Sequence, residues 1–201
     1  MSYLNFIKHT EKLTKTVAKS RPALGCVYID EAGEMFSTDA VCVYTAKGFV
    51  ESGEERTLDS KTMQSADVSY PKIKKVIPDI NDASYTGNLS LHAKELVSVL
   101  EGVYKCAKAS GGDFAWYDEI VFSKSGAKIS AGDFTASLLK AVEMPEDTIL
   151  ALSRLIAGMK YLKDMGATDV VINYFGHYKP VIFTALKGDV RFVILPIAKR
   201  N

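Results

Sequence analysis

The order of predicted elements repeats along the chain: a strand, a helix and then three strands. Apolar periodicity and turn residues predict two complete copies of this unit, at about 86–143 and 148–197. A third copy, at about 1–47, lacks most of its first strand and its last strand. Internal repetition constrains the fold more than any single motif, because each unit buries its apolar face against a neighbour. A helix followed by an antiparallel meander predicts an α+β fold, with helices packed on one face of antiparallel sheets.

Three segments have apolar residues at helical spacing. The predicted helices run over 3–19, from Ser90 to about Ala109, and over 154–165. Ser90 and Ser153 are expected to cap the second and third helices, since a serine hydroxyl can accept a hydrogen bond from the first helical turn. Arg21-Pro22 is expected to end the first helix, and Gly166 the third.

Runs of β-branched and aromatic residues bounded by turn residues predict the strands. The first unit has strands at 25–30 and 34–47, with a polar break at Thr38-Asp39-Ala40. The polar stretch 48–69 is expected to be a loop with one edge strand around 57–67. The other predicted strands are 83–91, 114–123, 126–133, 135–143, 147–152, 169–175, 179–186 and 190–197.

The stretch "SYPKIKKVIPDI" at 69–80 fits neither a helix nor a central strand. Pro71 and Pro78 would interrupt a helix, and each removes a donor from a strand ladder. We therefore expect a stiff connector, anchored by Val76 and Ile77, with its lysines in water. It divides the chain into a truncated unit plus linker at 1–82 and a complete domain of two half-units at 83–201.

Composition limits the class of protein. The 201 residues carry a formal net charge of +1, and 47% are hydrophobic, which is enough for a substantial core. Cys26, Cys42 and Cys106 form no CxxC pair and are expected to be buried, reduced thiols. The N-terminus does not resemble a secretory signal, and no window is long and apolar enough to cross a membrane, so a cytoplasmic protein is expected.

The search for catalytic motifs predicts that the chain is not an enzyme. His9, His92 and His177 have no metal-ligand spacing, so no metal site is expected. There is no GxSxG elbow and no phosphate-binding P-loop. No nucleophile, base and orienting group assemble, so no catalytic residue and no cofactor are assigned.

The first predicted helix carries a stripe of like charge: Lys8, Lys12, Lys15 and Lys19, in steps of four, three and four. Such a stripe is either a solvated face or a surface that contacts phosphates. Lysine suits sequence-independent binding, because its charge displaces counterions without reading bases. The later helices also carry basic residues, interrupted by Glu101 and Asp164.

Several stretches together resemble the bacterial sliding clamp, the beta subunit of DNA polymerase III. They are "RPALGCVYID", "EMFSTDAVCVY", "YPKIKKVIP", "LHAKELVSVLEGVYKCAK" and the segment 153–197, which ends in "VILPI". Each is weak alone, but they follow one another in the family's order and cover most of the chain. The resemblance implies repeated units whose helices line a ring around duplex DNA, with sheets outside and no enzymatic activity.

The resemblance also implies two sets of site residues. The DNA-facing set is Lys8, Lys12, Lys15, Lys19, Lys94, Lys105, Lys108, Arg154, Lys160 and Lys163. The set that would form a pocket for short apolar peptides of DNA polymerase or other clamp-binding proteins is Thr38, Pro71, Lys75, Val76, Val181, Val193, Leu195, Pro196 and Ile197.

The chain also departs from the family. Ala40-Val41-Cys42 stands where the family usually has Gly-His-Arg, and Arg154 stands where an aromatic residue is frequent. The family ring has twelve half-units, and four copies of a chain with three half-units would supply the same number. We therefore expect a homo-oligomer, either a tetramer or a dimer. Such a compact chain would be encoded by a phage or a mobile element. The alternatives are a non-encircling clamp-like decoy or scaffold that binds replication proteins, and an uncharacterised enzyme.

Overall fold

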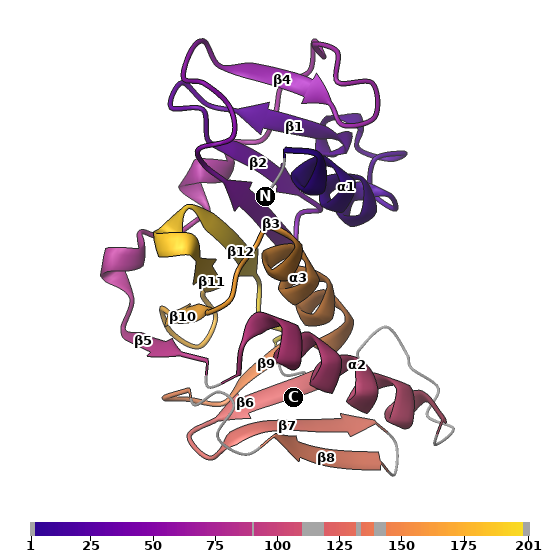
Figure 1. Cartoon of the computed structure of the whole chain (residues 1–201), viewed down its shortest axis with the longest axis vertical. Helices are drawn as coiled ribbons and strands as arrows, with labels where there is room; N and C mark the ends of the chain where they lie inside the picture. Colours follow the sequence, from indigo (N-terminus) through magenta and orange to yellow (C-terminus); the bar gives the residue numbers. More distant parts are fainter. Residues whose placement is uncertain (1–2, 90, 110–118, 132–133, 139–143, 199–201) are drawn as a thin grey trace.

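A computed structural model describes residues 3–89, 91–109, 119–131, 134–138 and 144–198. Every strand pairs antiparallel, in an eight-stranded sheet of order β4-β1-β2-β3-β12-β11-β10-β5 and a four-stranded sheet of order β8-β7-β6-β9 (Figure 1). The α+β prediction is therefore confirmed. The helices are α1 (Tyr3–Thr14), α2 (Ala93–Ala109) and α3 (Leu152–Asp164). The strands are β1 (Cys26–Ile29), β2 (Met35–Thr38), β3 (Cys42–Ala46), β4 (Arg56–Asp59), β5 (Tyr85–Asn88), β6 (Glu119–Ser123), β7 (Gly126–Ala131), β8 (Phe134–Leu138), β9 (Thr148–Ala151), β10 (Val171–Tyr174), β11 (Val181–Ala185) and β12 (Val190–Ile194).

The second and third units exchange their first strands. β5 begins the second unit but pairs with β10 of the third, and β9 begins the third unit but pairs with β6 of the second. Helices α2 and α3 of these two units pack against each other. The exchange interlocks the two repeats, so that neither sheet is complete without a strand from the other repeat.

The N-terminal unit is more complete than its sequence indicates. The segment 34–47 was predicted as one strand, but it forms β2 and β3 with a tight turn at 39–41, so the expectation that the last strand is missing is wrong. The first strand is replaced by β4, which pairs with β1 just as β5 pairs with β10. This strand overlaps the predicted edge strand at 57–67, but it begins one residue earlier and ends at Asp59.

Two helix boundaries differ from the prediction. Helix α1 ends at Thr14, and residues 15–20 continue as turns in which Val17 and Ala18 N–H both bond to the Thr14 carbonyl. Helix α3 begins at Leu152 with Ala151 at the N-cap, so Ser153 lies inside the first turn and is not the cap. Ser90 lies outside the described residues. Gly166 follows α3 with φ 92°, a left-handed conformation that glycine adopts without strain.

Strand β3 joins the two parts of the chain, because all five of its residues pair with all five residues of β12. Helix α3 lies over this seam on the inner side of the sheet. Its Tyr161 stacks on Tyr44 of β3 with ring centroids 4.2 Å apart. The Tyr161 hydroxyl also donates to the carbonyl of Thr45, at 2.7 Å. Stacking and a satisfied buried hydroxyl together hold α3 to a strand of the N-terminal unit.

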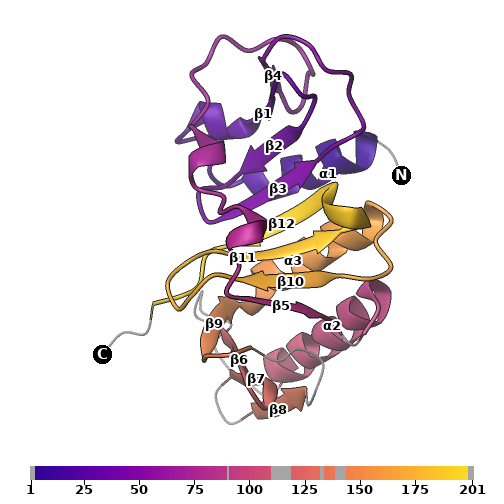
Figure 2. The same ribbon diagram turned by 90° about the vertical axis from the view of Figure 1, so that its left-hand side faces the viewer.

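The linker covers the outer side of the same seam (Figure 2). Its anchor is Ile73, 4% exposed, which packs in a cluster with Val43 of β3 and Val193 of β12. Val76 is 59% exposed, so its predicted role as an anchor is wrong; Ile77 is partly buried against the cluster. The apolar contact comes earlier in the linker because residues 73–75 form a short 3-10 turn that points Ile73 at the sheet.

An aromatic stack and an ion pair hold the linker further. Tyr70 stacks on Tyr28, with centroids 5.6 Å apart. Lys74 Nζ lies 2.6 Å from the carboxylate of Asp30, whose side chain is 4% exposed, and this contact raises the pKa of Lys74. The prediction that the linker lysines lie in water is therefore wrong for Lys74. Its ammonium group pairs with Asp30, because a buried carboxylate needs a cation.

The cysteine prediction is also corrected. Cys26 and Cys42 are buried thiols, but Cys106 is exposed on α2. The helix turns residue 106 away from the apolar face formed by Leu96 and Leu100.

The contact between α3 and the seam predicts the effect of one substitution. A Cβ at Gly158 of α3 would overlap the ring of Phe192 in β12. Gly158→Ala is therefore expected to lower the free energy of unfolding by about 1–3 kcal/mol, as overpacking typically does. Gly102→Ala on α2 is the matched control, because its Cβ would meet nothing within 4 Å, and it is expected to stabilise by up to about 1 kcal/mol. Urea unfolding measures both, and equal effects would contradict the packing described here.

Candidate functional site

An apolar groove of about 770 Å³ lies where the N-terminal unit, the linker and the end of β12 meet. Five segments form it: the turn that follows α1, the β2–β3 turn with its flanking strand ends, the linker, the β10–β11 turn at Pro180 and the C-terminal end of β12. Its lining residues are Arg21, Ala23, Leu24, Thr38, Ala40, Val41, Val43, Pro71, Lys72, Ile73, Lys75, Val76, Pro180, Val193 and Leu195.

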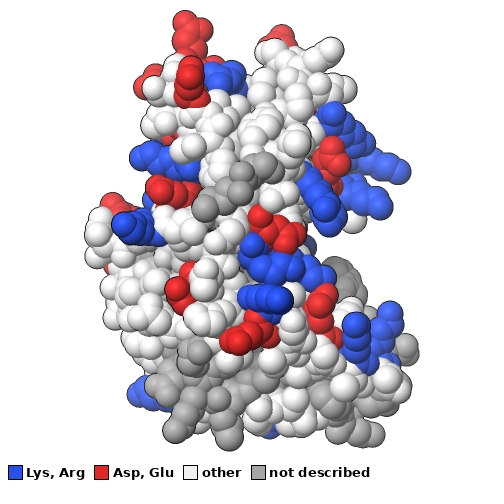
Figure 3. Space-filling view, viewed as in Figure 1, with Lys and Arg blue, Asp and Glu red and all other residues white. Residues whose placement is uncertain are grey.

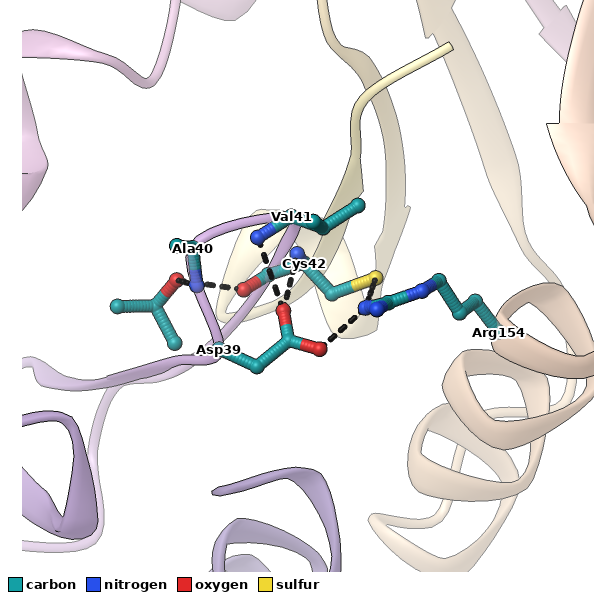
Figure 4. A network of polar contacts seen from close by, with 6 residues as sticks. Asp39, Ala40, Val41, Cys42 and Arg154 are labelled. Atoms are coloured by element: carbon teal, nitrogen blue, oxygen red, sulfur yellow. Dashed lines mark hydrogen bonds and ion pairs between the residues drawn. The ribbon is translucent and has the colours of Figure 1, made fainter. Parts of the chain in front are cut away.

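The β2–β3 turn that forms one wall is held by side-chain hydrogen bonds (Figure 4). One carboxylate oxygen of Asp39 accepts from the backbone N–H of Val41 at 2.9 Å and of Cys42 at 2.7 Å. The Thr38 hydroxyl donates to the Cys42 carbonyl at 2.7 Å and accepts from the Ala40 N–H at 3.0 Å. These bonds hold Ala40 at φ 76°, a left-handed conformation unusual for alanine. The turn is thus pre-shaped, with Ala40 and Val41 facing the groove.

Arg154 of α3 reaches the second carboxylate oxygen of Asp39 and also contacts the Cys42 sulfur. The Asp39 side chain is 7% exposed, so it needs this cation. Burial opposes the charge on Arg154, but the Asp39 carboxylate prevails and raises the Arg154 pKa. Burial, followed by the Asp39 charge, raises the pKa of the Cys42 thiol to about 12, so this cysteine stays protonated and is not a nucleophile.

Six of the nine predicted pocket residues line the groove: Thr38, Pro71, Lys75, Val76, Val193 and Leu195. The other three lie elsewhere. Val181 is fully buried in β11, and Pro196 and Ile197 are not in the lining, because the Ile197 N–H bonds to the Ile149 carbonyl of β9 at 2.8 Å. Most of the lining residues that were not predicted come from the Arg21–Leu24 segment and the β2–β3 turn. Both segments belong to stretches that carry the family resemblance, "RPALG" and "STDAV", and this resemblance could have pointed to them.

The groove is apolar inside and basic at its rim. Val76 and Leu195 are 59% and 41% exposed and line the same groove, and contiguous exposed apolar surface of this kind marks interaction sites. Arg21, Lys72 and Lys75 are the charged residues of the lining, and no carboxylate belongs to it among the described residues. The arrangement suits an extended peptide with apolar anchors and acidic neighbours.

The predicted DNA-facing residues lie on or beside the three helices (Figure 3). Lys8 and Lys12 are exposed on α1, whereas Lys15 and Lys19 are exposed beyond its end, so the stripe is only partly helical. Lys94, Lys105 and Lys108 are exposed on α2. Two of the cations on α3 have acidic neighbours: Lys160 lies 2.5 Å from Glu101, and Lys163 lies 3.4 Å from Asp164. Arg154 pairs with Asp39, so the freest cations are those of α1, the following turn and α2.

A second polar contact ties α1 to α3. His9 is 5% exposed, and its Nε2 lies 2.9 Å from the Asp164 carboxylate. Burial lowers the pKa of His9, so the neutral ring donates to Asp164 at pH 7. Burial alone would raise the pKa of Asp164, but the hydrogen bond from His9 and the nearby Lys163 lower it. His9 therefore forms a partly buried hydrogen bond that links α1 of the N-terminal unit to α3 of the third unit.

The described residues contain no group of three or more His, Cys, Asp or Glu side chains placed to hold a metal ion. His92 pairs with Asp169 at 3.0 Å on the surface, and His177 lies in the β10–β11 turn. Within the described part of the chain, no helix is both long enough and apolar enough to cross a bilayer.

Comparison with known proteins identifies the fold. No family model matches the sequence, and no curated protein sequence matches it. The DNA polymerase III beta subunit of Thermotoga maritima superposes with a TM-score of 0.69 at 14% identity, covering 100% of this chain and 65% of that one. The C. crescentus beta sliding clamp gives a TM-score of 0.72 at 12% identity, covering 99% and 64%. A Helicobacter pylori beta clamp, solved bound to a DNA ligase peptide, gives 0.67 at 11%, covering 97% and 63%.

The chain therefore has the sliding-clamp fold, which confirms the resemblance at the level of fold. It spans less than two thirds of the length of these structural relatives.

Proposed function

We propose that this chain is a sliding-clamp-like processivity factor. Several copies would form a ring around duplex DNA, with the helices facing the DNA and the groove tethering replication proteins. The observation that carries the proposal is the placement of α1, α2 and α3 over the sheets with exposed lysines, in a chain whose whole length superposes on sliding clamps.

The chemistry of the helix face supports loose contact with DNA. The exposed cations are lysines on α1, the following turn and α2. Lysines contact phosphates without reading bases, and contact of this kind depends strongly on salt. A ring that encircles DNA stays on it by topology, so it needs no tighter contact with the phosphates. DNA polymerase, or another protein with a suitable peptide, would be the partner in the groove.

The first test is binding to duplex DNA at several salt concentrations. Replacing Lys8, Lys12, Lys15 and Lys19 with Glu should weaken binding at least tenfold and flatten the salt dependence by about 3–4 in the log–log slope, since each lost phosphate contact contributes about 0.9. The matched control replaces Lys47, Lys61, Lys124 and Lys179, which are exposed and lie outside the helices. Unchanged binding in the first variant, or an equal loss in the control, would contradict the proposal.

A non-encircling interaction protein, such as a decoy or scaffold, is the second candidate. It is favoured by the groove, which requires no ring, and by the acidic partners of Lys160 and Lys163. Retention on circular DNA distinguishes the two candidates. A ring loaded on nicked circular DNA stays bound in high salt until the DNA is cut to linear form, whereas a non-encircling protein is lost from both forms.

The groove has its own test. A labelled extended peptide with adjacent Leu and Phe and a flanking Asp should bind, and Leu195→Glu should weaken it at least tenfold by placing a charge against the apolar anchors. Leu4→Glu is the matched control, because Leu4 is a large exposed apolar residue, 73% exposed, on α1. Fluorescence anisotropy measures both. Equal affinity for the two variants would show that the peptide binds elsewhere.

A further inference from the structure

The structure contains one example of how two units join through their sheets. β3 and β12 are the last strands of their units, and they pair antiparallel over their full length, from Val190 opposite Ala46 to Ile194 opposite Cys42. The eight-stranded sheet is thus two four-stranded halves joined by the last strands of two units.

The last strand of the remaining unit, β8, has no such partner in the described part of the chain. β8 ends the sheet β8-β7-β6-β9 in the place that β12 takes in its own half, β12-β11-β10-β5. Its inner edge pairs with β7, and its outer edge has no strand partner in the described part of the chain. Edge strands are usually protected by lysine, proline or a bulge. The β8 sequence, "FTASL", has no charge and no proline.

The opposite end of the molecule, at β4, is closed by its own chain (Figure 1). The Ala66 N–H donates to the Thr57 carbonyl and the Asp59 N–H to the Gln64 carbonyl, each at 2.9 Å. Leu58 also forms a bridge with Ser65. The returning segment 64–66 therefore occupies the outer edge of β4. The β8 strand of a second copy could pair with β4 only by displacing this segment. A head-to-tail contact, β8 of one copy on β4 of the next, is therefore blocked.

We propose that a second copy of this chain joins at β8, with the two β8 strands antiparallel about a two-fold axis. β3 and β12 are already paired within each chain, so the last strand that the second copy has free is its own β8. Antiparallel pairing of identical strands is self-complementary and closes as a dimer. The full overlap seen at β3 and β12 places Ala136 on the axis and Thr135 opposite Ser137 of the second copy.

The side chains fit the joined sheet. Ala136 lies opposite Ile129, which is 1% exposed, so Ala136 faces the helix side. Thr135 and Ser137 are exposed and alternate to the outer side. Across the axis they form Thr–Ser pairs, which stabilise antiparallel sheets through hydroxyl hydrogen bonds. The joined sheet keeps its apolar side under α2 and its polar side outward.

This joint goes beyond the proposed function, because it specifies how two chains meet at one contact of any ring. Chains would meet at β8 by a two-fold contact, and not by a head-to-tail contact. It does not depend on DNA binding. A failed dimer with intact binding to DNA would reject the joint alone.

The test uses the full chain with Cys106→Ser, which removes the exposed thiol, and adds Ser137→Cys. The two Cα atoms at position 137 should lie about 8 Å apart, from the spacing and rise of antiparallel strands, so a short bismaleimide should link most of the protein into covalent dimers. Lys61→Cys, near β4, is the control and should not cross-link. Light scattering should give at least twice the 22.0 kDa chain mass. A monomer, or an oligomer that cross-links at 61 and not at 137, would overturn the proposal.

Two proline variants separate loss of the joint from loss of folding. The N–H groups of neighbouring strand residues point to opposite edges, so one of Ala136→Pro and Ser137→Pro removes an N–H that faces away from β7. That variant should keep the melting temperature of the monomer fold and shift the mass to a monomer. If both variants remain dimeric, or if both unfold and Ser137→Cys does not cross-link, the β8 joint is rejected.

Discussion

The pairing of β3 with β12 is the contact on which the rest of the structure depends. It joins the four strands of the N-terminal unit to the β12-β11-β10-β5 half of the interlocked domain and makes one eight-stranded sheet from them. Both faces of the seam are covered: α3 packs on the inner side through Tyr161 and Tyr44, and the linker packs on the outer side through Ile73. A sheet seam covered on both sides excludes water from its hydrogen bonds, which strengthens them.

The groove is a consequence of this seam. Its walls come from parts of the chain that are distant in sequence and meet only because β3 and β12 are neighbours. The Asp39 carboxylate holds the β2–β3 turn, and Arg154 of α3 neutralises the buried carboxylate from the other side of the seam. Arg154 thus contributes to the shape of the groove more directly than to a surface for phosphates, because its charge is already matched by Asp39.

Much of the fold could be predicted from the sequence, because repetition and alternation are local signals. The linker was recognisable from Pro71 and Pro78, and Thr38, Pro71 and Leu195, which were expected at one pocket, all line the groove. The role of β4 could not be predicted, since "RTLD" is a strand only because β1 offers it an edge. The end of α1 and the pairing of Arg154 with Asp39 also depend on tertiary contacts that no local pattern reports.

Hydrogen exchange of the native chain tests the central claim most directly. If β3 and β12 form one cooperative seam, the amides of Val43 and Tyr44 should exchange as slowly as those of Phe192 and Val193, and both sets should gain the same protection as stability rises. Fast exchange in β1, β2 and β3 beside slow exchange in β10, β11 and β12 would contradict the account. It would mean that the N-terminal unit opens independently and that the groove has no permanent wall.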